Sequence, residues 1–167
     1  RKDVLFPIPV TDQIEISLAG NEYESFQLAI LPFGKDMNNL KVEVSDLISK
    51  DGNVIPKSIV ETSLVDYNKI EWQASYVTEY KGWHPDPLIP LKSGSKISGT
   101  DVCRPLWITV YAPAGTKAGE YTGTIKLSAD GMRKVTASVK CRVWDFDLPV
   151  ASHLKTHSWD QIEYLAD

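Results

Sequence analysis

The sequence contains few residues that could hold a metal ion or form a disulfide. Among its 167 residues are two cysteines, Cys103 and Cys141, and three histidines. Two cysteines do not supply the four ligands of a structural zinc site. Cys141 continues the apolar alternation of Val139 and Val143, so we expect a small buried hydrophobe rather than half of a disulfide. The sequence predicts neither a metal site nor a cofactor.

Runs of basic residues and long apolar runs are missing as well. The formal net charge is -4, and no window holds five consecutive basic residues. Nucleic acid is usually bound by a basic patch, so no nucleic-acid partner is expected. The longest apolar run is far shorter than the roughly 20 residues that span a bilayer, so no membrane partner is expected either.

The motifs of common hydrolases are also absent. The sequence has no Gly-x-Ser-x-Gly, no phosphate-binding loop and no His-Glu-x-x-His. Glycoside hydrolysis usually needs two carboxylates with tuned pKa values, whereas acids such as Glu15 and Glu43 stand at solvent-facing positions of predicted strands. We therefore predict that this chain by itself is not an enzyme, and we assign it no catalytic residue.

The sequence is rich in segments that alternate apolar and polar residues, which is typical of half-buried strands. The segment 59–65 is rich in β-branched residues, and the alternating segments lie at 13–18, 26–30, 40–44, 106–111, 121–127 and 133–144. Asp130-Gly131 predicts a tight hairpin turn between the last two. Many short strands separated by Gly and Pro predict an all-β fold, an immunoglobulin-like antiparallel β-sandwich.

The alternation lapses between Tyr67 and Arg104, where aromatic residues and prolines gather. The prolines of the segment 83–91 exclude a central strand and predict a stiff loop outside any ladder. One interpretation is sugar contact, with Trp83 as an aromatic platform and His84 and Asp86 as polar partners. The other is packing within the domain or against a neighbouring domain, and the mostly apolar composition favours it.

A second domain is expected to begin near the C-terminal end. After Pro149 the alternation stops, and Ser158 with Gln161 three residues later is a capping-box pattern at the start of a helix. We therefore expect a sandwich over residues 1–150, followed at 151–167 by a linker and the truncated start of another domain.

Four strings, in order, resemble the N-terminal domain of glycoside hydrolase family 123-like proteins. They are AGNEYESFQLAILP (19–32), WHPDPLIPL (83–91), PLWITVYAPAGTKAGEYTGTIKLSADG (105–131) and VWDFDLPVASHLKT (143–156). The resemblance extends over nearly the whole chain. It implies a β-sandwich that precedes a (β/α)-barrel catalytic domain, and that barrel is the partner expected within the same polypeptide.

The resemblance also implies what the parent protein does. Such enzymes resemble substrate-assisted hydrolases of β-linked N-acetylgalactosamine, in which an adjacent Asp-Glu pair orients the acetamido group and protonates the leaving group. No Asp-Glu dipeptide occurs in this sequence, so no catalytic residue is carried over. Family members are typically exported bacterial proteins, which implies a periplasmic or cell-surface location.

Three functions remain open. The first is a non-catalytic accessory domain of a secreted glycoside hydrolase-like protein that acts on 2-acetamido glycans. The second is an autonomous carbohydrate-binding module, with glycans as partners. The third is an adhesion-type sandwich domain, which the fold class alone would support.

Overall fold

The structure is a computed structural model, and it describes residues 11–71 and 81–151. Within these ranges the regular structure is β-strand, apart from one 3₁₀ turn at Lys57–Ile59. The strands are β1 (Gln13–Gly20), β2 (Glu22–Ile30), β3 (Met37–Val44), β4 (Leu47–Ser49), β5 (Val54–Ile55), β6 (Val60–Ile70), β7 (Gly82–Pro90), β8 (Ser95–Ile97), β9 (Arg104–Ala112), β10 (Gly119–Ser128) and β11 (Val135–Asp147). None of the described segments is a helix that could cross a membrane.

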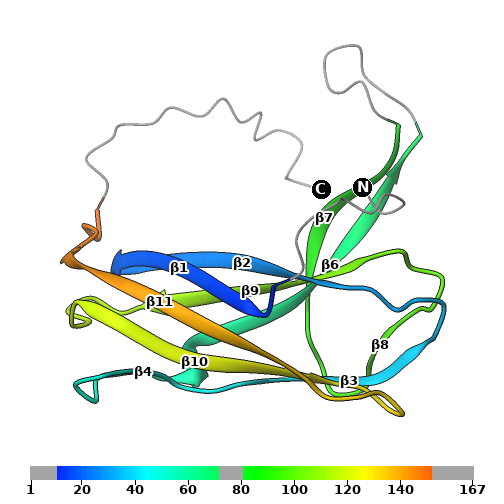
Figure 1. Cartoon of the computed structure of the whole chain (residues 1–167). Coiled ribbons are helices and arrows are strands. Elements are labelled where there is room, and N and C mark those ends of the chain that lie inside the picture. The colour runs from blue at the N-terminus through cyan, green and yellow to red at the C-terminus, as the bar shows by residue number, and fades with distance from the viewer. Residues whose placement is uncertain (1–10, 72–80, 152–167) are drawn as a thin grey trace, which may run out of the picture.

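The strands form two sheets that pack face to face (Figure 1). The seven-stranded sheet has the order β1-β11-β10-β3-β8, with β4 paired to β10 and β5 paired to β4. The four-stranded sheet has the order β2-β9-β6-β7. The predicted all-β sandwich is confirmed, and the finer immunoglobulin-like assignment stays a prediction.

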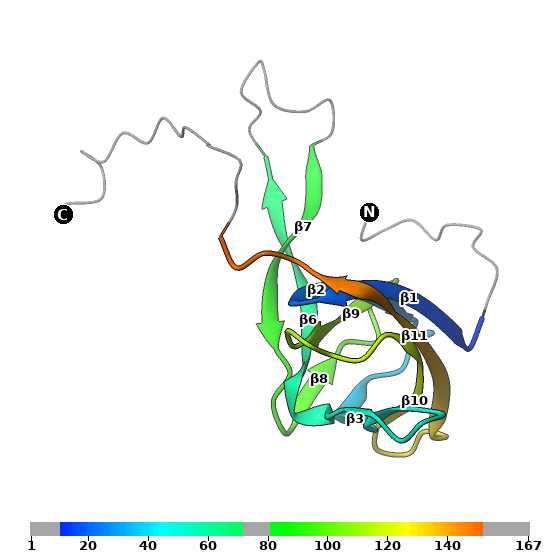
Figure 2. The same cartoon turned by 90° about the vertical axis from the view of Figure 1, so that its left-hand side faces the viewer.

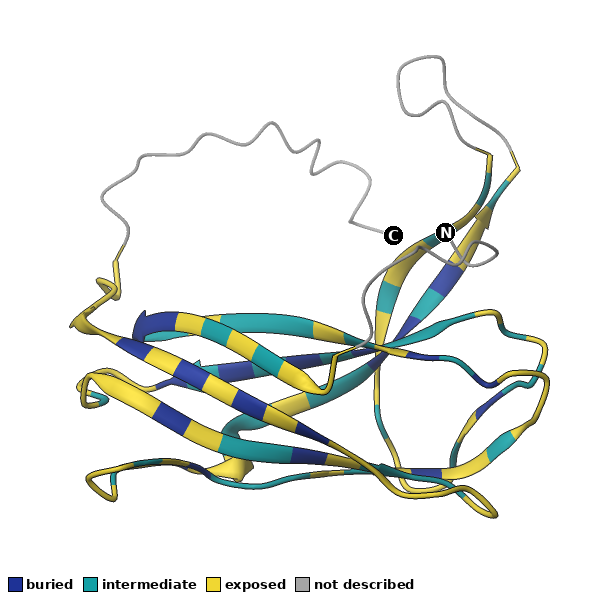
Figure 3. Cartoon of the chain, viewed as in Figure 1, coloured by how far each residue is buried: buried dark blue, intermediate teal, exposed yellow. Residues whose placement is uncertain are grey.

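The core lies between the two sheets and follows the alternation of the sequence. Along β9 every second residue is buried, and β11 repeats the pattern up to Val143 (Figure 3). Large side chains with at most 1% of their surface exposed include Leu18, Leu40, Leu47, Ile55, Ile97, Leu106, Ile108, Tyr121 and Ile125. Burial of about 20 apolar side chains is the main stabilising contribution expected for a domain of this size.

The predicted hairpin of β10 and β11 is confirmed. The pairing runs from Gly119 opposite Val143 to Leu127 opposite Val135. Gly131 in the turn has a φ of 68°, a conformation that favours glycine. A shift of the register by one residue would expose both apolar sets, so the alternation fixes this pairing.

One pairing departs from the expected antiparallel sandwich. β1 runs parallel to β11, with Gln13 opposite Ser138 and Leu18 opposite Val143. Asn21, with a φ of 57°, lies in the connection that leads from β1 in one sheet to β2 in the other. Because β1 and β2 lie in different sheets, β1 does not form a hairpin with β2 and instead adds to the free side of β11.

The proline-rich segment forms a strand, so the prediction of a loop outside any ladder is wrong. β7 pairs with β6 from Pro90 opposite Ser63 to Gly82 opposite Ile70, with a register shift near Asp66. β7 is the outermost strand of its sheet, where residues without an N–H are tolerated because no further strand needs their donors. The exclusion of a central strand was correct. Together, β6 and β7 extend beyond the sandwich as an arm (Figure 2).

The two cysteines are free thiols. Cys141 is fully buried on the inner face of β11, as the alternation predicted. Burial raises the pKa of the Cys141 thiol to about 12, so this thiol is a packing residue rather than a nucleophile.

Candidate functional site

The structure places the three candidate residues on β7, in the arm. Trp83 is 39% exposed and stands opposite Lys69, while His84 stands opposite Asn68. Asp86 is exposed, and one of its carboxylate oxygens accepts a hydrogen bond of 2.9 Å from Nδ2 of Asn68. Each candidate is therefore accessible from solvent or from a partner.

The three residues do not share one face of the arm. Successive side chains of a strand point to opposite faces, so Trp83 lies on one side and His84 and Asp86 lie on the other. An aromatic platform and its polar partners would have to face the same sugar. This arrangement disfavours the three-residue sugar site and is compatible with contacts on both sides of the arm.

An ion pair fixes the base of the arm to the sandwich. Nη1 of Arg104 on β9 lies 2.8 Å from Oδ1 of Asp66 on β6, and the Arg104 side chain is only 17% exposed. The same guanidinium lies 5.9 Å from the ring centroid of Tyr67. Burial raises the pKa of the Tyr67 hydroxyl. These contacts tie the base of the arm to β9, the neighbour of β6 in the sheet. The arm therefore leaves the sandwich in a defined direction.

The sequence-based candidates did not include a second surface, on the outer side of the four-stranded sheet. The pairing of β2 with β9 puts Tyr23 opposite Tyr111, and their rings stack with centroids 4.3 Å apart. Nε1 of Trp107 donates to Oγ1 of Thr109 over 3.2 Å. We call this surface the aromatic face; it comprises Tyr23, Ser25, Gln27 and Ala29 of β2 with Pro105, Trp107, Thr109 and Tyr111 of β9.

A signal for this face was present in the sequence. In 106–111 the core residues alternate with Trp107, Thr109 and Tyr111, where a sheet open to water usually has charged residues. The signal could not be used without the pairing, because β2 and β9 are about 80 residues apart and only the register brings Tyr23 onto Tyr111.

The aromatic face is connected to the point where the chain leaves the sandwich. The hydroxyl of Tyr111 donates to Oδ1 of Asn21 over 3.1 Å, and Nδ2 of Asn21 donates to the carbonyl oxygen of Leu148 over 3.0 Å. The Leu148 amide donates to the Gly20 carbonyl over 2.8 Å. The segment after β11 is therefore held beside the end of the aromatic face.

The described carboxyls with shifted pKa values are not suited to acid catalysis. The Gly99 amide, 2.8 Å away, and Lys96 lower the pKa of Asp36, and Lys134 at 2.9 Å lowers the pKa of Glu43. A general acid of a glycosidase needs a raised pKa instead. No cluster of three potential metal ligands occurs in residues 11–71 and 81–151.

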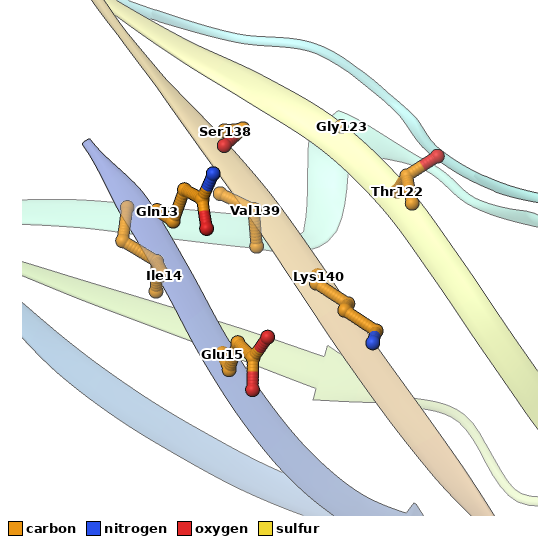
Figure 4. Close-up of a pocket in the computed structure, with 8 residues that line it drawn as sticks. All are labelled: Gln13, Ile14, Glu15, Thr122, Gly123, Ser138, Val139 and Lys140. Atoms are coloured by element: carbon orange, nitrogen blue, oxygen red, sulfur yellow. The ribbon is translucent and has the colours of Figure 1, made fainter. Parts of the chain in front are cut away.

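A shallow hollow of about 200 Å³ lies on the outer side of the seven-stranded sheet, over β1, β10 and β11 (Figure 4). Its lining comprises Gln13, Ile14, Glu15, Thr122, Gly123, Ser138, Val139 and Lys140. Small-molecule sites usually enclose about 300–1,000 Å³ and are mostly apolar with convergent polar groups. This hollow is smaller than that range, so we assign it no ligand.

Solved structures similar to this chain include one with a clearly shared fold. A family 123 glycoside hydrolase from Clostridium perfringens, described for its hydrolysis of glycolipid glycans, superposes with a TM-score of 0.73 at 18% identity. The match covers 83% of this chain and 24% of that chain. This chain thus spans about a quarter of the length of that relative. At such identity the likeness shows the fold alone.

Two further solved structures are less similar to this chain, with TM-scores below 0.5. An endo-fucoidan hydrolase of glycoside hydrolase family 107 has a TM-score of 0.35 at 12% identity, over 80% of this chain and 13% of that one. A PapD-like domain of human CEP192 has a TM-score of 0.40 at 7% identity, over 86% of this chain and 95% of that one. No curated protein sequence matches the chain.

A family match covers most of the sandwich. The sequence profile described as "Glycoside hydrolase 123 N-terminal domain" matches residues 20–129, from the β1–β2 connection through β10. This range is well over half of the chain, and it agrees with the superposed fold. The chain belongs to the glycoside hydrolase 123 N-terminal domain family.

Proposed function

We propose that this chain is the non-catalytic N-terminal accessory domain of an exported glycoside hydrolase-like protein that acts on 2-acetamido glycans of the N-acetylgalactosamine type. The observation that carries the proposal is the family match over residues 20–129. The similar Clostridium perfringens enzyme supports it, because that chain is about four times longer than the part matched here.

The proposal includes a division of the polypeptide. In this division residues 1–150 are the sandwich domain, of which 1–10 and 72–80 lie outside the described ranges. Residues 151–167, of which all but the first also lie outside them, lead into a (β/α)-barrel catalytic domain. The partner of the sandwich is then the barrel of the same polypeptide. The location is the periplasm or the cell surface, in keeping with the export typical of such proteins.

The test compares the purified chain with the complete gene product. Both are assayed with aryl 2-acetamido-2-deoxy-β-glycosides. We expect turnover by the complete protein and none by residues 1–167. Turnover by the short chain that disappears on replacing one of its own acids would contradict the proposal, and so would a complete protein that lacks a further domain.

One observation favours a second candidate, a carbohydrate-binding module. The stacked rings of Tyr23 and Tyr111 and the nearby Trp107 resemble the aromatic platforms on which pyranose rings pack. Titration calorimetry of the short chain with N-acetylgalactosamine oligosaccharides tests it. Saturable binding that is lost in Trp107→Ala would support this candidate over the accessory domain.

A further inference from the structure

We infer that the aromatic face and the β6–β7 arm together form the surface on which the next domain of the polypeptide packs. This inference rests on the proposed function, because it names the surface through which the accessory domain acts. The occupant is the polypeptide that follows the sandwich, rather than a second copy of the chain or a glycan.

The two outer sides of the sandwich differ in the number of charged residues. The outward positions of the seven-stranded sheet include the charged residues Glu15, Lys41, Glu43, Glu120, Lys126, Lys140 and Arg142. The eight residues of the aromatic face include no charged residue, and the nearest outward position of β6 adds one, Glu61. Apart from Trp144 and Phe146 at the end of β11, which are 44% and 58% exposed, the seven-stranded sheet therefore has the outer surface expected to face water.

The composition of the aromatic face is typical of a surface that packs against another domain. Interface cores are depleted in charged residues and enriched in Tyr and Trp. An antiparallel sheet that faces water on one side usually has polar residues on that side, whereas four of the eight positions of the aromatic face hold Tyr, Trp or Pro. Tyr23, however, is 63% exposed in the sandwich alone. A covering partner would remove this ring from water.

The aromatic face lies between the end of β11 and the arm. The end of β11, held by Asn21 and Leu148, lies at one end of the four-stranded sheet, and the arm rises at the other end (Figure 1). The aromatic face lies on the strands between them. A domain attached after Leu148 is thus tethered at the edge of this face. On the arm, Trp83 and Leu88 stand opposite Lys69 and Val65, on the same side of the sheet as Trp107, and their exposed fractions of 39% and 46% provide further apolar area.

The similar Clostridium perfringens enzyme has about three quarters of its length outside the match, since the match covers 24% of it. Because a covalent tether raises the effective concentration of the neighbouring domain, the next domain reaches this face ahead of a free partner.

The experiment uses the complete protein and two matched substitutions. Gln27 and Gln13 are both exposed glutamines on strands, Gln27 on the aromatic face and Gln13 on the outer side of the seven-stranded sheet. Gln27→Lys places a charge in the proposed interface without removing core packing, and Gln13→Lys is its control. The readout is the rate of proteolytic separation of the sandwich from the rest of the protein, with calorimetry of the thermal transitions.

We expect Gln27→Lys to speed the separation about tenfold or more and to split a shared thermal transition in two, since a buried unpaired charge is costly. Gln13→Lys should resemble the wild type. Equal behaviour of the two variants would overturn the inference, and so would a larger effect of Gln13→Lys. The proposed function would survive either of these two results if the complete protein is active and the short chain is inactive.

A second measurement does not depend on any variant. Hydroxyl-radical labelling of the complete protein compares Tyr23 with Trp144, which is 44% exposed on the outer side of the seven-stranded sheet. After correction for intrinsic reactivity, we expect Tyr23 to be labelled several times more slowly than Trp144. Labelling in proportion to the exposed fractions of the two side chains would overturn the inference. Slow labelling of Tyr23 only at high protein concentration would identify a second copy as the occupant, and slow labelling only with added glycan would identify a sugar; either result overturns it too.

Discussion

Replacing Gly123 by alanine tests whether the packing inside the seven-stranded sheet is as close as the structure indicates. Gly123 lies in β10 at an inward-facing position between the buried residues Tyr121 and Ile125. A Cβ atom at this position would lie 2.5 Å from Cδ2 of Leu47, 2.9 Å from the carbonyl oxygen of Asp46 and 2.9 Å from Oγ of Ser45. These neighbours are fixed: Leu47 is 1% exposed, and Oγ of Ser45 accepts from the Thr124 amide at 2.9 Å.

Two effects of opposite sign decide the outcome. Alanine is favoured over glycine within a strand by about 0.5–1 kcal/mol, because glycine loses more backbone entropy on folding. Overpacking a filled core costs about 1–3 kcal/mol, and here part of the clash is with backbone that cannot rotate away. We therefore expect Gly123→Ala to lower the free energy of unfolding by about 1–2 kcal/mol.

Urea unfolding of residues 1–167, followed by circular dichroism and tryptophan fluorescence, measures this difference. With an m-value of about 2 kcal/mol/M, the midpoint should fall by roughly 0.5–1 M. Thr122→Ala, on the outer side of the same strand, is the control and should stay within about 0.5 kcal/mol. A Gly123→Ala chain at least as stable as the wild type would refute the close packing of β10 against the segment 45–47.

The remaining predictions concern an exposed tryptophan and the two thiols. Trp83→Ala should cost about 1–2 kcal/mol in urea unfolding, less than the 3–5 kcal/mol of a fully buried aromatic side chain, because Trp83 is 39% exposed on an edge strand; a larger loss would make it a core residue. Both cysteines should react with a thiol reagent after denaturation without reductant, and a chain with no reactive thiol would contradict the free thiols of the structure. The free energy of unfolding should fall as the pH rises from 9 to 12, because the Cys141 thiol keeps its proton up to a pKa of about 12 when folded and ionises near 9.0 when unfolded. The fall should be smaller in Cys141→Ala. If the pH profile of this variant equals that of the wild type, the result would argue against the burial of the Cys141 thiol.

For the candidate site, the sequence singled out Trp83, His84 and Asp86 but not their arrangement. The prolines correctly indicated an edge, since they remove backbone donors at any position. They did not indicate that the segment pairs with β6, because that pairing depends on a partner strand and on the register shift near Asp66. The aromatic face was missed for the same reason: half of it comes from β2 and half from β9, and the sequence does not give the register between them.

The class of the fold, the hairpin of β10 and β11, and the inward set of core residues could be predicted from the amino-acid sequence. These follow from local rules, since side chains alternate along a strand and a one-residue slip would expose the core. Three features became visible only in the folded chain: the parallel placement of β1 beside β11, the projection of the arm, and the stacking of Tyr23 on Tyr111. Those features arise from contacts between segments far apart in the chain, whose free energies depend on which strands become neighbours, and a local pattern contains no information about that choice.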